Sequence, residues 1–168
     1  MYKRQGQRPG HFRGVATVVT KLMNLSRAQE AFFGQKDAQQ VLVIKRFVKD
    51  LNIQVNVNMV PIVREESGLA RSSRNAYLSP EEKQAALVLS ISLKKAEEAY
   101  KAGETSVEAL KNIVRNEIAT EPMAVIDYVE LYSFDELKEI SQVKGESLLA
   151  IAVKIGKTRL IDNIIIGC

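Results

Sequence analysis

The fold of this chain is decided at residues 32–40, which read Phe32-Phe33-Gly34-Gln35-Lys36-Asp37-Ala38-Gln39-Gln40. An apolar run ends there in glycine, lysine and aspartate, where a stretch with helical periodicity begins. Glycine after a strand lets a ligand approach the backbone closely, and the start of a helix offers unpaired N–H groups and a positive dipole end to phosphate. The segment therefore predicts a nucleotide site, although a strand–glycine–helix junction with a solvated Lys-Asp pair is a common alternative.

Two neighbouring segments narrow this interpretation. Residues 8–19 read Arg-Pro-Gly-His-Phe-Arg-Gly-Val-Ala-Thr-Val-Val, and residues 68–75 read Gly-Leu-Ala-Arg-Ser-Ser-Arg-Asn. In this order and spacing the three segments resemble the pantoate–β-alanine ligase family, a relative of the class I aminoacyl-tRNA synthetases and other nucleotidyltransferases. The resemblance extends from about Gln7 to Ile166. It implies that pantoate attacks the α-phosphate of ATP to give pantoyl adenylate and pyrophosphate, after which β-alanine displaces AMP.

The resemblance implies which residues bind ATP. Lys36 and Arg74 match residues that contact the phosphates, and an ammonium and a forked guanidinium both suit that role. The serines before Arg74 would add donors on a mobile loop similar to the KMSKS loop of class I synthetases. The expected catalytic residues are Lys36, Ser72, Ser73 and Arg74, and the expected ATP-binding residues are Gly34, Lys36, Asp37, Val63, Arg71, Ser72, Ser73 and Arg74. Without the resemblance, Ser-Ser-Arg-Asn is typical of an ordinary surface turn.

The resemblance also implies a pantoate site. An amide on the first turn of the second helix would bind the pantoate hydroxyl and carboxylate, and three valines would wall the pocket. The expected pantoate-binding residues are Gln40, His11, Arg8, Val15, Val18 and Val19. A histidine at a helix start is more often a cap than a catalyst, and valines suit core packing equally well. No Asp, Glu or His cluster has zinc-ligand spacing, so the expected metal is Mg²⁺ held mainly by ATP phosphates.

The chain departs from the family pattern in two places. The resemblance implies a preceding region of more than a hundred residues with a His-x-Gly-His motif that grips the phosphates, whereas the one histidine of this chain is His11. We therefore expect a C-terminal portion of the ligase that does not adenylate pantoate alone. Arg71 stands where relatives usually carry an apolar residue.

Composition limits the alternatives. The 168 residues suffice for one domain, or one small domain and part of another, and no apolar run reaches 18 residues. The basic start lacks the apolar stretch of a signal peptide, and the single cysteine is Cys168, so we expect a cytoplasmic protein without a membrane span or internal disulfide. The resemblance further implies a homodimer.

Charge is distributed unevenly along the chain. Residues 1–79 contain 13 Lys and Arg against 5 Asp and Glu, whereas residues 80–168 contain 11 against 15. A basic half that holds all three motif segments suits a polyanion such as ATP, and nucleic acid is the less favoured alternative. No RRM, KH or helix-turn-helix signature supports nucleic acid.

Periodicity predicts the order of the elements. Helical spacing favours helices over residues 11–25 and 37–51, and strands are expected over residues 30–33 and 53–60. The capping box at residues 79–82 predicts a helix to about Ala102, and Thr105 is expected to cap a second one. Later strands are expected over residues 125–131, 148–155 and 159–166, the last two joined by the turn Gly156-Lys157.

This order predicts an α/β protein with two parts. Residues 1–62 are expected to form a truncated nucleotide-binding part, namely the second half of a Rossmann-like parallel sheet of the nucleotidyltransferase or HUP type. Residues 63–168 are expected to form a C-terminal α+β domain with a small antiparallel sheet. This second part is a lid or substrate domain in the ligase interpretation, and a non-catalytic folded or dimerisation module in the alternative.

Overall fold

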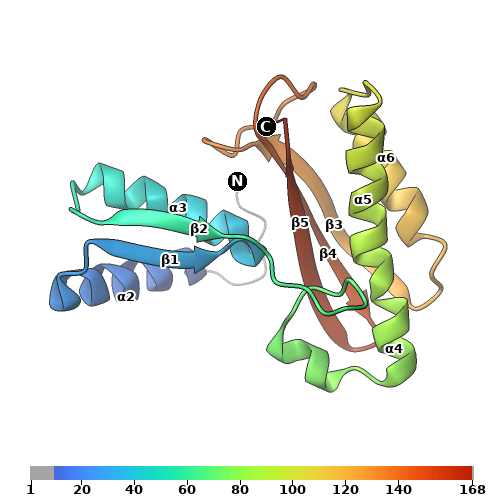
Figure 1. Cartoon of the computed structure of the whole chain (residues 1–168), viewed down its shortest axis with the longest axis horizontal. Coiled ribbons are helices and arrows are strands. Elements are labelled where there is room, and N and C mark those ends of the chain that lie inside the picture. The colour runs from blue at the N-terminus through green and yellow to red at the C-terminus, as the bar shows by residue number, and fades with distance from the viewer. Residues whose placement is uncertain (1–9, 168) are drawn as a thin grey trace. The chain divides into compact units, whose positions relative to one another are not determined.

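A computed structural model describes residues 10–167 (Figure 1). The chain divides into two compact units, Met1–Pro61 and Ile62–Cys168. The first unit contains a parallel two-stranded sheet and the second an antiparallel three-stranded sheet, which confirms the predicted mixed α/β class with a small antiparallel sheet.

The first unit is a parallel strand pair covered by helices. It contains α2 (His11–Ser26), β1 (Glu30–Gly34), a 3₁₀ turn (Gln35–Asp37), α3 (Ala38–Asp50) and β2 (Asn56–Val60). The strands pair in parallel from Glu30 opposite Asn56 to Gly34 opposite Val60. A small core of Met23, Ile44 and Val48 packs with Ala31, Phe33 and Val57, so both helices contact this sheet.

The exposed face of the parallel pair carries a polar cluster. The carboxylate of Glu30 accepts hydrogen bonds from the side-chain amides of Asn56 at 2.8 Å and Asn58 at 2.5 Å. The bond from Asn56 is the larger cause and the bond from Asn58 the second, and together they hold the pKa of the Glu30 carboxyl below its usual value. The cluster links the two strands across their solvent side.

The second unit packs two long helices against the antiparallel sheet. Its elements are a 3₁₀ helix (Ser73–Tyr77), α4 (Pro80–Ala85), α5 (Leu87–Lys101), α6 (Val107–Ile118), β3 (Ala124–Ser133), β4 (Ser147–Ile155) and β5 (Thr158–Ile166). The sheet order is β3-β4-β5, and α5 and α6 lie side by side along it (Figure 1). Its core joins Leu93, Leu110 and Val114 from the helices to Leu149, Ile151 and Val153 from β4.

Several predicted boundaries needed correction. The helix expected from Ser79 to Ala102 is interrupted at Ala86, where ψ of −17° tightens the turn. Ser106 rather than Thr105 caps α6, because its hydroxyl accepts the N–H of Ala109. The second strand begins at Asn56 and not at Ile53. The Gly156-Lys157 hairpin is confirmed, with Ile155 paired to Thr158.

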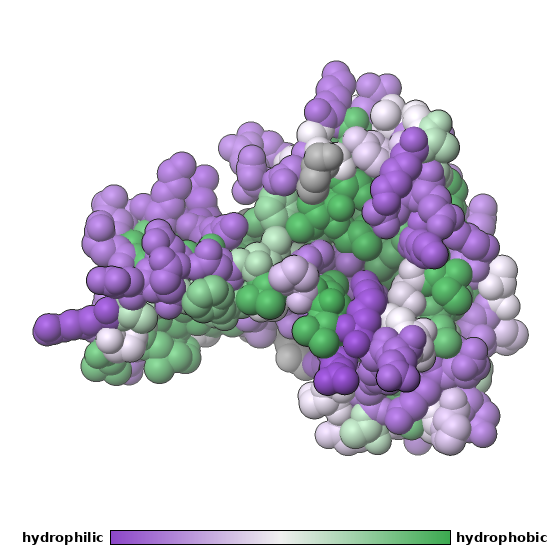
Figure 2. Space-filling view, viewed as in Figure 1, coloured by the Kyte–Doolittle hydropathy of each residue, from purple (hydrophilic) through white to green (hydrophobic). Residues whose placement is uncertain are grey.

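The apolar face of α2 is only partly a core face. Phe12 and Met23 are buried, whereas Val18, Leu22 and Leu25 are 56%, 59% and 80% exposed. Figure 2 shows hydrophobic side chains gathered on the surface over α2, while the surface over α3 is mainly hydrophilic. Packing in the core therefore does not account for all of the apolar residues of α2.

A buried ion pair fixes the start of the second unit to its sheet. Asp162 on β5 has a side chain that is 2% exposed, and its two oxygens accept bonds of 2.7 and 3.0 Å from the guanidinium of Arg64. The N–H of Asn163 donates to the same carboxylate at 2.8 Å. A buried carboxylate needs such compensation because desolvation penalises its charge.

We predict that Arg64→Ala lowers the free energy of unfolding by about 2–3 kcal/mol, because it leaves the Asp162 carboxylate without its counter-ion; this is below the range for fully buried pairs since Arg64 is partly solvated. Urea denaturation measures the change. Asp162→Asn is the control and costs less than Arg64→Ala, since it removes the buried charge itself. A cost below about 1 kcal/mol for Arg64→Ala would contradict the assignment.

Candidate functional site

A hollow of about 600 Å³ opens in the first unit between the start of α2 and the first turn of α3. Its lining residues are Gly10, His11, Gly14, Val15, Val18, Val19 and Gln40. It therefore brings together five of the six residues that the sequence predicts for pantoate, and the sixth, Arg8, lies outside the described residues. Gln40 follows the carboxyl end of β1, the end at which open α/β sheets bind ligands.

The hollow has one apolar wall and two polar groups. Val15 and Val19 also contact the core below them, whereas Val18 is 56% exposed and contributes its side chain to the wall. The Nε2 atom of His11 is buried and has no hydrogen-bond partner among the described residues. A small ligand with methyl groups and hydrogen-bonding oxygens would suit the valine wall and the side-chain amide of Gln40.

Gly14 adds room to this hollow. It lies inside α2, where glycine costs roughly 0.5–1 kcal/mol relative to alanine. A Cβ built at Gly14 meets no atom of the described residues within 4 Å, so packing against residues 10–167 does not require glycine. The prediction of the site from sequence missed Gly14, although glycine within a helical pattern often has a functional reason and was a usable signal.

The strand end at the centre of the nucleotide prediction has the expected layout. Gly34 ends β1 in an extended conformation with φ of −69°, and Gln35–Asp37 form a 3₁₀ turn before α3 begins. Helix α3 thus starts at Ala38, one residue later than predicted, and Gln40 lies on its first turn. Lys36 and Asp37 are half-buried in the turn, while Gly34 is exposed.

A tight hairpin in the second unit brings Val63 next to Arg71. The N–H of Arg71 donates to the carbonyl of Val63 at 2.9 Å, and the N–H of Glu65 donates to the carbonyl of Leu69 at 2.8 Å. Gly68 occupies the turn with φ of +93°, a value that favours glycine. Two of the predicted ATP-binding residues are therefore held side by side by the backbone.

Residues 71–74, at the end of this hairpin and after it, differ in the exposure and the hydrogen bonding of their side chains. The hydroxyl of Ser72 accepts the N–H of Arg74 at 3.2 Å and so caps the 3₁₀ helix Ser73–Tyr77. The side chains of Arg71 and Ser73 are exposed, and Arg74 is half-buried. The Ser72 hydroxyl oxygen thus stabilises the loop itself, whereas Arg71 and Ser73 present side chains to solvent.

Neither a metal cluster nor a membrane span is found in the described part of the chain. Within residues 10–167, no group of three His, Cys, Asp or Glu side chains is placed to hold a metal ion. No helix in this range is long and apolar enough to cross a membrane.

The chain belongs to the pantoate–β-alanine ligase family, whose sequence profile matches residues 3–165. It is 61% identical over 160 residues to a pantothenate synthetase of Pelotomaculum thermopropionicum, covering 95% of this chain and 57% of that protein. A pantothenate synthetase of Acetivibrio thermocellus is 57% identical over 159 residues, with the same coverage. The chain therefore spans a little over half the length of these curated relatives.

Solved structures agree with this assignment. Pantothenate synthetase from Thermus thermophilus superposes with a TM-score of 0.90 at 41% identity, covering 96% of this chain and 58% of that one. Pantoate–β-alanine ligase from Francisella tularensis, described as complexed with β-γ ATP and β-alanine, gives a TM-score of 0.67 at 30% identity and covers 96% and 52%. The predicted family is confirmed.

We predict that Gly14→Ala raises the free energy of unfolding by about 0.5–1 kcal/mol, because alanine favours the helix and its Cβ enters empty space. Urea denaturation of the two proteins measures the difference. Thr17→Ala is an exposed change on the same helix that measures the gain from alanine propensity alone, less the 2.9 Å bond that the Thr17 hydroxyl donates to the Arg13 carbonyl. If Gly14→Ala is destabilising, the chain itself needs glycine there and the room in the hollow has another cause.

Proposed function

We propose that this chain supplies the pantoate pocket and phosphate-binding residues of an ATP-dependent ligase that joins pantoate to β-alanine. The observation that supports the proposal is the hollow lined by His11, three valines and Gln40. Pantoate carries two methyl groups on one carbon, flanked by hydroxyls and a carboxylate. The valine wall suits the methyl groups, and the Gln40 amide can donate to the carboxylate and a hydroxyl.

The chemistry proceeds in two displacements. The pantoate carboxylate attacks the α-phosphate of ATP, and the bond to pyrophosphate breaks to give pantoyl adenylate. The amine of β-alanine then attacks the pantoyl carbonyl, loses a proton and displaces AMP, which leaves an amide. Both steps require the nucleophile to be held in line and negative charge on the phosphates to be stabilised.

Lys36 and Arg74 are the cations that we assign to the phosphates. Lys36 follows the exposed end of β1, and Arg74 belongs to the Ser72-capped turn. Ser73 and the backbone of Ser72 are assigned as further phosphate donors, and Val63 and Arg71 as neighbours of the nucleotide. Gly34 and Asp37 are assigned to the ribose and adenosine side. Mg²⁺ would be held mainly by phosphate oxygens, the ligands that this ion prefers, and would offset their charge.

We propose binding without turnover for this polypeptide on its own. It contains one histidine, so the paired histidines implied for the phosphate grip are not among its 168 residues. Each lost donor of that kind typically costs 10²–10³-fold or more in rate. AMP release that depends on both pantoate and β-alanine would contradict this part of the proposal.

Two further roles remain proposals. The Ile62–Cys168 unit encloses its own core from α5, α6 and the sheet, which supports its acting as a lid and equally as a folded dimerisation module. We also propose a homodimer, as the family resemblance implies, and light scattering of the purified chain would test it.

We predict that isothermal titration detects binding of ATP–Mg²⁺ and of a non-hydrolysable pantoyl adenylate mimic. Lys36→Ala should lower the affinity for each of the two ligands by roughly 10-fold or more, because it removes a charge-assisted contact to phosphate. Gly14→Ala should weaken the affinity for the adenylate mimic alone, because the added Cβ takes up space in the pantoate hollow.

Lys45→Ala is the matched control, since it removes an exposed lysine from the same helix region and should leave both affinities unchanged. Equal binding by wild type and Lys36→Ala would remove Lys36 from the site. No binding by the folded wild-type chain would contradict the proposed function as a whole.

A further inference from the structure

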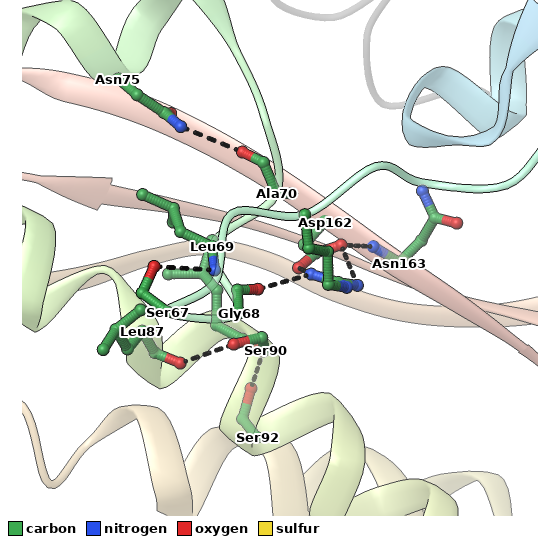
Figure 3. A network of polar contacts seen from close by, with 12 residues as sticks. Ser67, Gly68, Leu69, Ala70, Asn75, Leu87, Ser90, Ser92, Asp162 and Asn163 are labelled. Carbon is green, nitrogen blue, oxygen red and sulfur yellow. Dashed lines mark hydrogen bonds and ion pairs between the residues drawn. The ribbon is translucent and has the colours of Figure 1, made fainter.

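The side chain of Asn75 links the 3₁₀ helix Ser73–Tyr77 to the hairpin before it (Figure 3). Its Nδ2 atom donates to the Glu65 carboxylate at 2.8 Å and to the Ala70 carbonyl at 3.2 Å. Glu65 and Ala70 lie on opposite limbs of the hairpin, and Asn75 lies in the 3₁₀ helix capped by Ser72. One amide therefore links three segments of chain around Arg71–Arg74.

The orientation of this amide is determined by its partners. A carboxylate oxygen and a backbone carbonyl are both acceptors, so the group facing them must be the NH₂ and not the oxygen. Asn75 is 6% exposed, and its Oδ1 is buried without a hydrogen-bond partner among the described residues. A buried unpaired oxygen is costly, so the two donated bonds have to outweigh it.

The hairpin itself is anchored to the sheet. The guanidinium of Arg64 pairs with Asp162 on β5 and donates to the Gly68 carbonyl at 3.2 Å. Figure 3 shows Gly68 close to Asp162 and Asn163 of β5, and the side-chain amide of Asn75 directed at the Ala70 carbonyl. Arg64 fixes the hairpin at its turn. Asn75 bonds to both limbs of the hairpin, so it can fix residues 71–74 relative to the sheet as well.

We propose that Asn75 is a positioning residue that holds residues 71–74 in the conformation that binds phosphate. The inference rests on the proposed function, in which Arg74 and its neighbours contact ATP. Asn75 does not need to touch the nucleotide, because its Nδ2 group is engaged within the loop. A loop held in its binding conformation loses less entropy when the ligand arrives and so binds more tightly.

Substitution by aspartate tests the bond polarity directly. In Asn75→Asp, the new carboxylate faces the Glu65 carboxylate and the Ala70 carbonyl with no donor between them, so the loop should open. In Glu65→Gln/Asn75→Asp, the glutamine amide introduced at position 65 can donate to the new carboxylate, which restores the link with reversed polarity. Asn116→Asp, an exposed change on α6, is the control for added charge.

The first readout is the rate at which trypsin cleaves the Arg71–Ser72 bond in the full chain, with cleavage after Lys95 and Arg115 followed in parallel. Asn75→Asp should accelerate cleavage after Arg71 roughly 10-fold. The double variant should return to within about threefold of wild type, and the control should not change. A merely structural role would instead accelerate all three cleavages together, because the whole unit would open.

The second readout is the affinity for ATP–Mg²⁺ by isothermal titration. Asn75→Asp should lose roughly 10-fold, with partial recovery in the double variant. The positioning role would be overturned if Asn75→Asp is cleaved after Arg71 at the wild-type rate. It would also be overturned if adding Glu65→Gln does not slow the cleavage of Asn75→Asp. Absence of ATP–Mg²⁺ binding by the wild type would instead overturn the proposed function, so the two failures are distinguishable.

Discussion

The parallel pairing of β1 and β2 is the constraint on which the first unit depends. Because Gly34 lies opposite Val60, both strands end at the same edge, and the turn Gln35–Asp37 leaves from it. Helix α3 must then cross back over the sheet, which places Gln40 on its first turn beside the start of α2. An antiparallel or shifted pairing would take the carboxyl end of β2, at Val60, away from Lys36 and Gln40.

The features that give the hollow its room and its apolar wall lower the stability of α2. The proposed ligand gives a reason for them, because it would occupy that room and cover that wall. Helix α2 keeps Gly14 in its interior and leaves Val18 largely exposed, and both choices are unfavourable for a helix that only has to pack. A similar conflict occurs at Asn75, whose oxygen is buried without a partner among the described residues while its NH₂ grips the hairpin. Such local conflicts are expected where function and not stability selects the residue.

Local patterns predicted most of the fold, and long-range contacts account for what was missed. Alternation and helical spacing located β1, α3, β2 and the Gly156 hairpin because those signals lie within short windows. The break at Ala86 has no glycine or proline to indicate it. The Arg64–Asp162 pair joins residues 98 apart, and the link from Asn75 to Glu65 requires the hairpin to be folded first, so neither is visible in the sequence. The roles of Lys36, Gln40 and Arg74 stay predictions.

The most direct test of the account is to map backbone amide NMR shifts while titrating the labelled chain with the pantoyl adenylate mimic. We expect the amide shifts to change at residues 11–19, at residues 34–40 and at residues 71–75. A second hollow, at the opposite end of the first unit between Arg27 and Asn52, provides an internal reference and should show no changes. Changes confined to that second hollow, or none in a folded sample, would contradict the proposed site.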